Sequence, residues 1–203
     1  MEKIKDIYWI PAAGIDSNIY VIGNILVDAG TGRNEEYIFS QLKTEGISPS
    51  DIEMIVNTHC HYDHVGGNCL FPDAKVAIHE IDAVPLREEG HPLTVSSMFG
   101  DIIQRHDTDI ELKEGDKIAD FKVLHTPGHT KGGICLYDGE TLISGDTVFS
   151  HGGFGRTDIG GDLNDMKNSI SRLNELEVEY LLPGHGPCVN QGNRHLFMSY
   201  SQF

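Results

Sequence analysis

Short apolar runs recur along the chain and predict β-strands. They are three or four residues long, many of their residues are β-branched or aromatic, and they are bounded by Gly, Asp, Asn or Pro. Two of the intervening turns, Gly23-Asn24 and Asp138-Gly139, are typical of β-hairpins. The predicted strands are Ile7–Ile10, Ile19–Ile22, Ile25–Val27, Met54–Val56, Lys75–Ile78, Phe121–Leu124, Ile134–Tyr137, Thr141–Ile143 and Tyr180–Leu182.

Two segments carry apolar residues at helical spacing. The first begins at Asn34, which is suited to cap a helix, carries Ile38 and Leu42 on the same face as Tyr37, and ends at Gly46. The second begins at Asp162, and its apolar stripe consists of Met166, Ile170 and Leu173. Both stripes indicate helix faces that pack on a core.

Residues 80–109 are divided into short pieces by Pro85, Pro92 and Gly100. This segment is interpreted either as short helices over a site or as a mobile lid. In both halves of the chain strands come first and helices follow, which predicts an α/β (α+β) sandwich in which helices cover packed sheets. The length of 203 residues indicates one domain, residues 1–203.

Charge and composition narrow the range of functions. The net charge of −16 argues against a nucleic-acid partner, because nucleic-acid binding needs a basic surface. No signal peptide and no apolar stretch of about 18 residues is visible, so we expect a cytoplasmic protein without a membrane partner. The four cysteines are scattered, which argues against a disulfide framework.

A dense group of possible metal ligands directly follows the predicted strand Met54–Val56. At a period of two residues, His59, His61 and Asp63 project the same way from an extended chain, and a turn brings His64 to the same cavity. Imidazole and carboxylate ligands together suit zinc, iron or manganese.

Three later segments share one design, in which a single ligand stands just beyond a predicted strand and beside a glycine. These ligands are His129, Asp146 and His185. Loops held by a rigid sheet are common places for functional sites. In combination with the first group, the three segments predict a metal centre.

These motifs resemble the metallo-β-lactamase fold, with the compact glyoxalase II-like (hydroxyacylglutathione hydrolase-like) enzymes as the most similar members. The resemblance covers essentially the whole chain and implies an αββα sandwich with the site along one edge of the sheets. It also implies two divalent ions, zinc or alternatively iron or manganese. By resemblance, His59, His61 and His129 bind the first ion, Asp63, His64 and His185 bind the second, and Asp146 bridges both.

The chemistry expected of such a site is hydrolysis by metal-bound hydroxide. Two divalent ions lower the pKa of a shared water from about 15.7 towards 7, so that hydroxide attacks an electrophilic carbonyl. Asp63 is the candidate catalytic residue that orients this nucleophile or relays its proton. Cys60 points away from the ligands by alternation, so we expect it to pack in the core.

Further segments narrow the family member. Asp146 stands where some β-lactamases have a cysteine ligand, which disfavours antibiotic hydrolysis. Residues 153–158 resemble a pattern in glyoxalase II-like thioesterases and persulfide dioxygenases, and residues 183–187 resemble the compact glyoxalase II-like hydrolases. The expected substrate is therefore a small acyl-thiol such as S-acyl-glutathione, or another ester. The alternatives are a lactonase, a mononuclear iron persulfide dioxygenase and a non-catalytic metal-binding scaffold.

One cation near the ligands is a candidate for substrate binding. Arg156 either pairs with a substrate carboxylate or bonds to Asp158 and loop carbonyls. The histidines outside the motifs are expected at the surface or around the ligands. They are His79, His91, His106, His125, His151 and His195.

Overall fold

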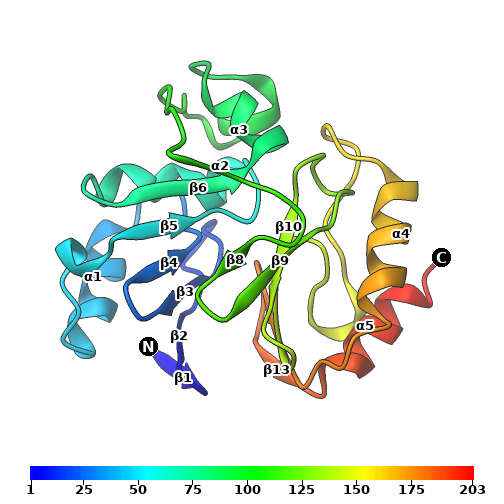
Figure 1. Cartoon of the computed structure of the whole chain (residues 1–203). Coiled ribbons are helices and arrows are strands. Elements are labelled where there is room, and N and C mark those ends of the chain that lie inside the picture. The colour runs from blue at the N-terminus through cyan, green and yellow to red at the C-terminus, as the bar shows by residue number, and fades with distance from the viewer. The chain divides into compact units, whose positions relative to one another are not determined.

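The computed structural model describes residues 1–203, which form two compact units. The N-terminal unit comprises Met1–Ile78 and Ala83–Glu111, and the C-terminal unit comprises His79–Asp82 and Leu112–Phe203. Each unit is built around one β-sheet with its own helices, so the predicted α/β class is confirmed (Figure 1). That the two units act as a single domain stays a prediction.

The sheet of the N-terminal unit has seven strands in the order β1-β2-β3-β4-β5-β6-β7. The first four strands pair antiparallel, whereas β4, β5 and β6 pair parallel. Parallel neighbours need a crossover connection, and helix α1 (Glu35–Thr44) makes it between β4 and β5. The strands are β1 (Glu2–Ile4), β2 (Ile7–Ile10), β3 (Ile19–Ile22), β4 (Ile25–Val27), β5 (Met54–Val56), β6 (Lys75–His79) and β7 (Ile110–Leu112).

Helix α1 covers this sheet with the apolar stripe that the sequence predicted. Ile38 and Leu42 are buried in one cluster with Leu26, Ile55 and Val76 of the strands. Burial of such side chains stabilises the fold by about 1.5–3 kcal/mol each. The short helices are α2 (Tyr62–Val65), α3 (Glu80–Leu86, which begins in the C-terminal unit) and the 3₁₀ helices η1 (Pro49–Asp51), η2 (Gly66–Leu70), η3 (Pro92–Thr94) and η4 (Ser96–Phe99).

The sheet of the C-terminal unit has six strands in the order β13-β12-β11-β10-β9-β8. Only β11 and β12 pair parallel. Helix α4 (Leu163–Leu173) lies in their connection, and together with α5 (Gly192–Tyr200) it packs on the sheet (Figure 1). The remaining elements are β8 (Lys117–Ile118), β9 (Phe121–His125), β10 (Ile134–Tyr137), β11 (Thr141–Gly145), β12 (Tyr180–Pro183), β13 (Val189–Asn190) and the 3₁₀ helix η5 (Ser150–Gly152).

Helix α4 confirms its predicted start and buried face. The Asp162 carboxylate accepts hydrogen bonds from the backbone N–H groups of Asn164 and Asp165, which caps the helix. Met166 and Ile170, on the predicted stripe, are fully buried.

Asn34 precedes α1 as predicted, but the prediction that its side chain caps the helix is wrong. Its amide donates to the Ala13 carbonyl and to Asp16 instead of accepting from the first turn. Within residues 80–109, three short helices (α3, η3 and η4) end at Phe99, and residues 100–109 contain no helix. Whether this segment covers a site or moves as a lid stays a prediction. Pro85 does not break this segment where expected, because it lies inside α3, one residue before that helix ends.

Candidate metal centre

The N-terminal set of candidate ligands, defined as His59, His61, Asp63 and His64, follows β5. The His59 ring lies 4.8 Å from that of His61 and 4.0 Å from that of His64, measured between centroids. The Nε2 of His64 lies 3.8 Å from the Asp63 carboxylate. The three imidazoles are buried, so the sequence motif becomes a compact cluster.

The extended conformation expected through Asp63 is wrong. The chain is extended at His61, but Tyr62–Val65 form helix α2, so Asp63 and His64 lie on a helical turn. Long-range backbone bonds hold this turn, since Ser17 N–H donates to the Asp63 carbonyl and Ala29 N–H to that of His64. The cluster therefore depends on tertiary contacts rather than on strand periodicity.

A buried carboxylate, Asp28, organises the N-terminal set. It accepts the backbone N–H and the hydroxyl of Thr58, each at 2.8 Å, and lies 2.8 Å from Nδ1 of His64. Because a carboxylate only accepts, His64 Nδ1 carries a proton. The Thr58 hydroxyl donates to Asp28, so its contact with His59 Nδ1 at 3.1 Å requires that nitrogen to donate as well.

Both tautomers leave the lone pair on Nε2, which makes this atom the candidate metal ligand. Asp28 was not among the residues predicted from the sequence. In the sequence, its position directly after the apolar run Ile25–Val27 is the one feature that could have indicated it. In the structure, the backbone at Asp28 is left-handed, with φ of +59°.

The C-terminal set, defined as His129, Asp146 and His185, lies beyond the ends of β9, β11 and β12. One carboxylate oxygen of Asp146 lies 3.4 Å from Nε2 of His129 and 3.6 Å from Nε2 of His185. The side chains of His129 and Asp146 are nearly buried, whereas that of His185 is 34% exposed. The unit thus gathers the three residues that the sequence placed after separate strands.

The tautomer of His129 is set by the chain itself. Its Nδ1 donates to the backbone carbonyl of Arg156 at 2.7 Å, and in the neutral ring this leaves the lone pair on Nε2, 3.4 Å from an Asp146 oxygen. Gly155 lies against both residues, because a Cβ atom at this position would meet the Asp146 carbonyl oxygen at 2.3 Å and Nδ1 of His129 at 2.7 Å.

The Arg156 side chain forms a two-pronged ion pair with Asp158, at 2.8 and 2.7 Å. This is the structural alternative of the two that the sequence left open, and substrate binding by Arg156 stays a prediction. The sulfur of Cys60 is buried in an apolar cluster with Val65 and Ile78, which confirms its packing role.

Two histidines outside the motifs are buried with partners of their own. His79 stacks on His125 at 4.1 Å, and burial followed by the charge of His125 lowers the pKa of His79 to about 4. His195 accepts a hydrogen bond from the backbone of His151. Of the two positions expected, the surface is wrong for His79 and His195, because each is almost fully buried, whereas a position around the ligands stays a prediction.

The chain belongs to the metallo-beta-lactamase superfamily, whose model matches residues 13–185. A probable metallo-hydrolase of Methanocaldococcus jannaschii is 37% identical over 202 residues, covering 93% of this chain and 95% of the relative. An acyl-coenzyme A thioesterase of Homo sapiens is 28% identical and covers 88% of this chain and 77% of its own. A hydroxyacylglutathione hydrolase of Klebsiella pneumoniae is 34% identical over 64% of this chain and 46% of its own.

Solved structures agree with the family. TTHA1623 in a di-iron-bound form superposes with a TM-score of 0.77 at 30% identity, over 92% of this chain and 96% of its own. The BLEG-1 B3 metallo-beta-lactamase superposes with a TM-score of 0.79 at 29% identity, over 95% and 99%. The predicted fold family is therefore confirmed, and the chain is a metallo-hydrolase of this superfamily with histidine and aspartate side chains as candidate ligands.

None of the helices combines the length and the apolar character that crossing a bilayer requires. The cytoplasmic location expected from the sequence stays a prediction.

Proposed function

We propose that the chain hydrolyses thioesters of small acyl-thiols, such as S-acyl-glutathione, with two divalent metal ions. The N-terminal and C-terminal sets together supply the ligands. By the resemblance, His59, His61 and His129 would hold one ion, Asp63, His64 and His185 would hold the other, and Asp146 would be shared by both.

The observation that carries this proposal is the position of Asp146. A single carboxylate oxygen faces Nε2 of His129 and Nε2 of His185 at similar distances, which is the arrangement that a bridging carboxylate needs. The Nδ1 hydrogen bonds of His59, His64 and His129 add to it, because a neutral imidazole that donates from Nδ1 has its lone pair on Nε2 for a metal ion.

The donor set fits zinc, which accepts imidazole nitrogen and carboxylate oxygen. Iron and manganese accept the same ligands, and the di-iron-bound form of TTHA1623 supports iron as the alternative. When bound, two such ions supply a hydroxide nucleophile near neutral pH and stabilise negative charge on the substrate oxygen.

The chain's own residues complete the chemistry. Asp28 and the Arg156 carbonyl hold the imidazoles in one tautomer and orientation, so that no rearrangement is needed during the reaction. Asp63, whose side chain is 14% exposed, orients the attacking water and accepts its proton. Water adds to the thioester carbonyl, the C–S bond breaks, and the products are a carboxylate and a thiol.

Thioesters are favoured as substrates because two relatives are named for this chemistry, the acyl-coenzyme A thioesterase and the hydroxyacylglutathione hydrolase. A second candidate is the opening of a cyclic ester or amide, such as a lactone or β-lactam. It is supported by the superposition on the B3 metallo-beta-lactamase over 95% of this chain.

A substrate panel on wild type and on Cys60→Ser tests the proposal. We expect S-acyl-glutathione and acyl-coenzyme A to be cleaved at least about tenfold more efficiently, in kcat/KM, than lactones or the β-lactam nitrocefin. Cys60→Ser is expected to keep most of the activity, because the thiol is buried in an apolar cluster and performs no chemistry. The thiol released from a thioester is measured with a chromogenic disulfide. Opening of the lactone or β-lactam ring is measured by absorbance.

Mass spectrometry of the protein during turnover supplies the control. An acyl group trapped on Cys60, or loss of activity in Cys60→Ser with its metal content unchanged, would refute direct attack by water. Preference for a lactone or for nitrocefin would replace the thioester assignment by the second candidate.

A further inference from the structure

Helix α2 is one turn long, yet it carries two of the proposed ligands, Asp63 and His64. A helix this short has almost no stability of its own, so its position must come from tertiary contacts. Its first residue, Tyr62, directly precedes Asp63. Contacts of the Tyr62 side chain therefore act on the backbone that carries both ligands.

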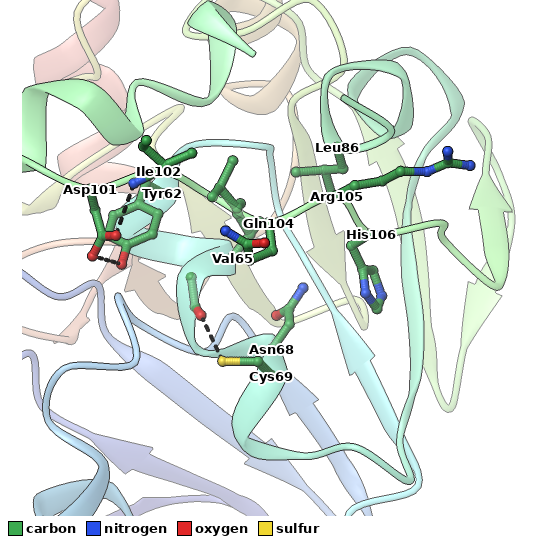
Figure 2. A pocket seen from close by; sticks show the side chains of 12 residues that line it. Tyr62, Val65, Asn68, Cys69, Leu86, Asp101, Ile102, Gln104, Arg105 and His106 are labelled. Carbon is green, nitrogen blue, oxygen red and sulfur yellow. Dashed lines mark hydrogen bonds between the residues drawn. The ribbon is translucent and has the colours of Figure 1, made fainter. Parts of the chain in front are cut away.

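The phenol of Tyr62 is held by a polar network from two other segments of the N-terminal unit. Its hydroxyl donates to the carboxylate of Asp101 at 2.6 Å, as Figure 2 shows. Arg33 donates to the same carboxylate oxygen at 3.2 Å and to the Phe99 carbonyl at 2.7 Å. The other oxygen of Asp101 accepts from the backbone N–H of Ile102 at 2.9 Å.

Ring contacts accompany these hydrogen bonds. The Phe99 ring lies 5.6 Å from the ring of Tyr62, and the Arg33 guanidinium lies 5.9 Å from the same ring. The segment that contains Phe99 and Asp101 is thereby fastened to helix α2. We name Arg33, Tyr62 and Asp101 the α2 clamp.

Apolar packing leaves one side of α2 open. A cavity of about 380 Å³ is lined by Tyr62 and Val65 of the helix and by Ile103 and Gln104. Figure 2 shows Tyr62, Val65 and Gln104 beside this cavity. Because this space is not filled by side chains, packing restrains the helix less on this side than a close-packed core would. The clamp lies at the edge of the cavity and supplies a directional restraint on that side.

The charges of the clamp keep the donor and acceptor roles fixed. Burial, followed by the hydrogen bond to Asp101, raises the pKa of Tyr62 to about 12, so its hydroxyl remains a donor at neutral pH. The hydrogen bond from Tyr62, followed by those from Ile102 N–H and Arg33, lowers the pKa of Asp101, which therefore remains a carboxylate. A neutral donor on an ionised acceptor gives a strong hydrogen bond.

We propose that Asp101 is a positioning residue that acts through Tyr62 to fix helix α2, and with it the direction of Asp63 and His64 towards their metal ion. This inference rests on the proposed function. It assigns the clamp to one of the two ions, because His59 and His61 precede the helix.

Titration with Zn²⁺ against a competing chelator tests the assignment in Tyr62→Phe, Asp101→Ala and the double variant. Tyr62→Phe removes the hydroxyl and keeps the ring. We expect the affinity for one of the two zinc equivalents to fall about tenfold and the affinity for the other to stay unchanged. A tenfold loss is the lower end of what removing a residue that supports a metal ligand costs. The double variant should lose no more than a single one, because both changes break the same hydrogen bond.

The matched control is Asp107→Ala. It removes an exposed ion pair with Arg105 in the same segment, and neither residue belongs to the α2 clamp. Its zinc affinities should equal those of wild type. Three results would overturn the positioning role. They are an equal loss of zinc affinity in Asp107→Ala, additive losses of zinc affinity in the double variant, and an equal loss of affinity for both zinc equivalents.

Amide hydrogen exchange of the metal-free protein gives a readout that needs neither metal nor activity. The amides of His64 and Val65 donate to the His61 carbonyl, and we expect them to exchange several-fold faster in Tyr62→Phe and Asp101→Ala than in wild type. If wild type binds no metal ion, the proposed function fails while this measurement still tests the clamp. Unchanged exchange of the His64 and Val65 amides in both variants would refute the role of the α2 clamp.

Discussion

Replacing Asp146 with Ala is expected to lower kcat by at least about a hundredfold and to reduce the bound metal to about one equivalent or less per chain. The carboxylate faces two imidazoles of the C-terminal set, so its loss removes a ligand from both proposed ions at once. Elemental analysis and steady-state kinetics on the same preparation measure the two effects. Because Asp146 is almost buried, circular dichroism is needed to show that the variant is folded.

His106→Ala is the matched control for a histidine that is no ligand. His106 lines the cavity beside α2, and its backbone N–H donates to the Leu86 carbonyl, a bond that the substitution keeps. Its metal content and turnover should stay within about twofold of wild type. Equal damage in His106→Ala and Asp146→Ala would show that the proposed ligand set is not selective.

Gly155→Ala is expected to destabilise the protein by about 2 kcal/mol or more and to lower its metal content. The added methyl group would stand 2.3 Å from the Asp146 carbonyl oxygen and 2.7 Å from Nδ1 of His129. Neither neighbour can yield without moving a proposed ligand, since Gly155 N–H also donates to that carbonyl. Thermal unfolding of the metal-free protein separates the loss of stability from the loss of metal.

Gly153→Ala provides the comparison within the same loop. The three atoms nearest to its methyl group would belong to the Phe149 side chain, at 3.3 Å or more, and its φ of −73° suits alanine. We expect a change of less than about 1 kcal/mol and an unchanged metal content. If Gly155→Ala and Gly153→Ala change stability and metal content equally, the close approach of Gly155 to the C-terminal set does not affect either quantity.

The sequence predicted most strands of the two sheets and the candidate ligands, but not Asp28. Strands such as Ile19–Ile22 and Ile134–Tyr137 have the expected bounds, because a short apolar run bounded by turn residues is typical of a buried strand. The candidate ligands were visible because metal sites need rare residue types at strand ends. In the structure, His129, Asp146 and His185 do follow β9, β11 and β12.

Other features depend on contacts that a local pattern does not contain. Helix α2 is held by bonds to residues far away in the sequence, and α5 begins after Gln191, a left-handed residue without a side-chain cap. Asp28 orients His64, 36 residues further along the chain, so no spacing rule reveals it. The α2 clamp joins Arg33 to Asp101 over an even longer separation.

The most direct test of the central claim is the metal content of protein purified without added metal, determined by elemental analysis beside a thioester assay. The account predicts about two equivalents of divalent metal per chain, with hydrolysis that is lost on chelation and regained when metal is restored. A chain that binds a single iron, needs no second ion for full activity and consumes oxygen would contradict it and favour the dioxygenase alternative.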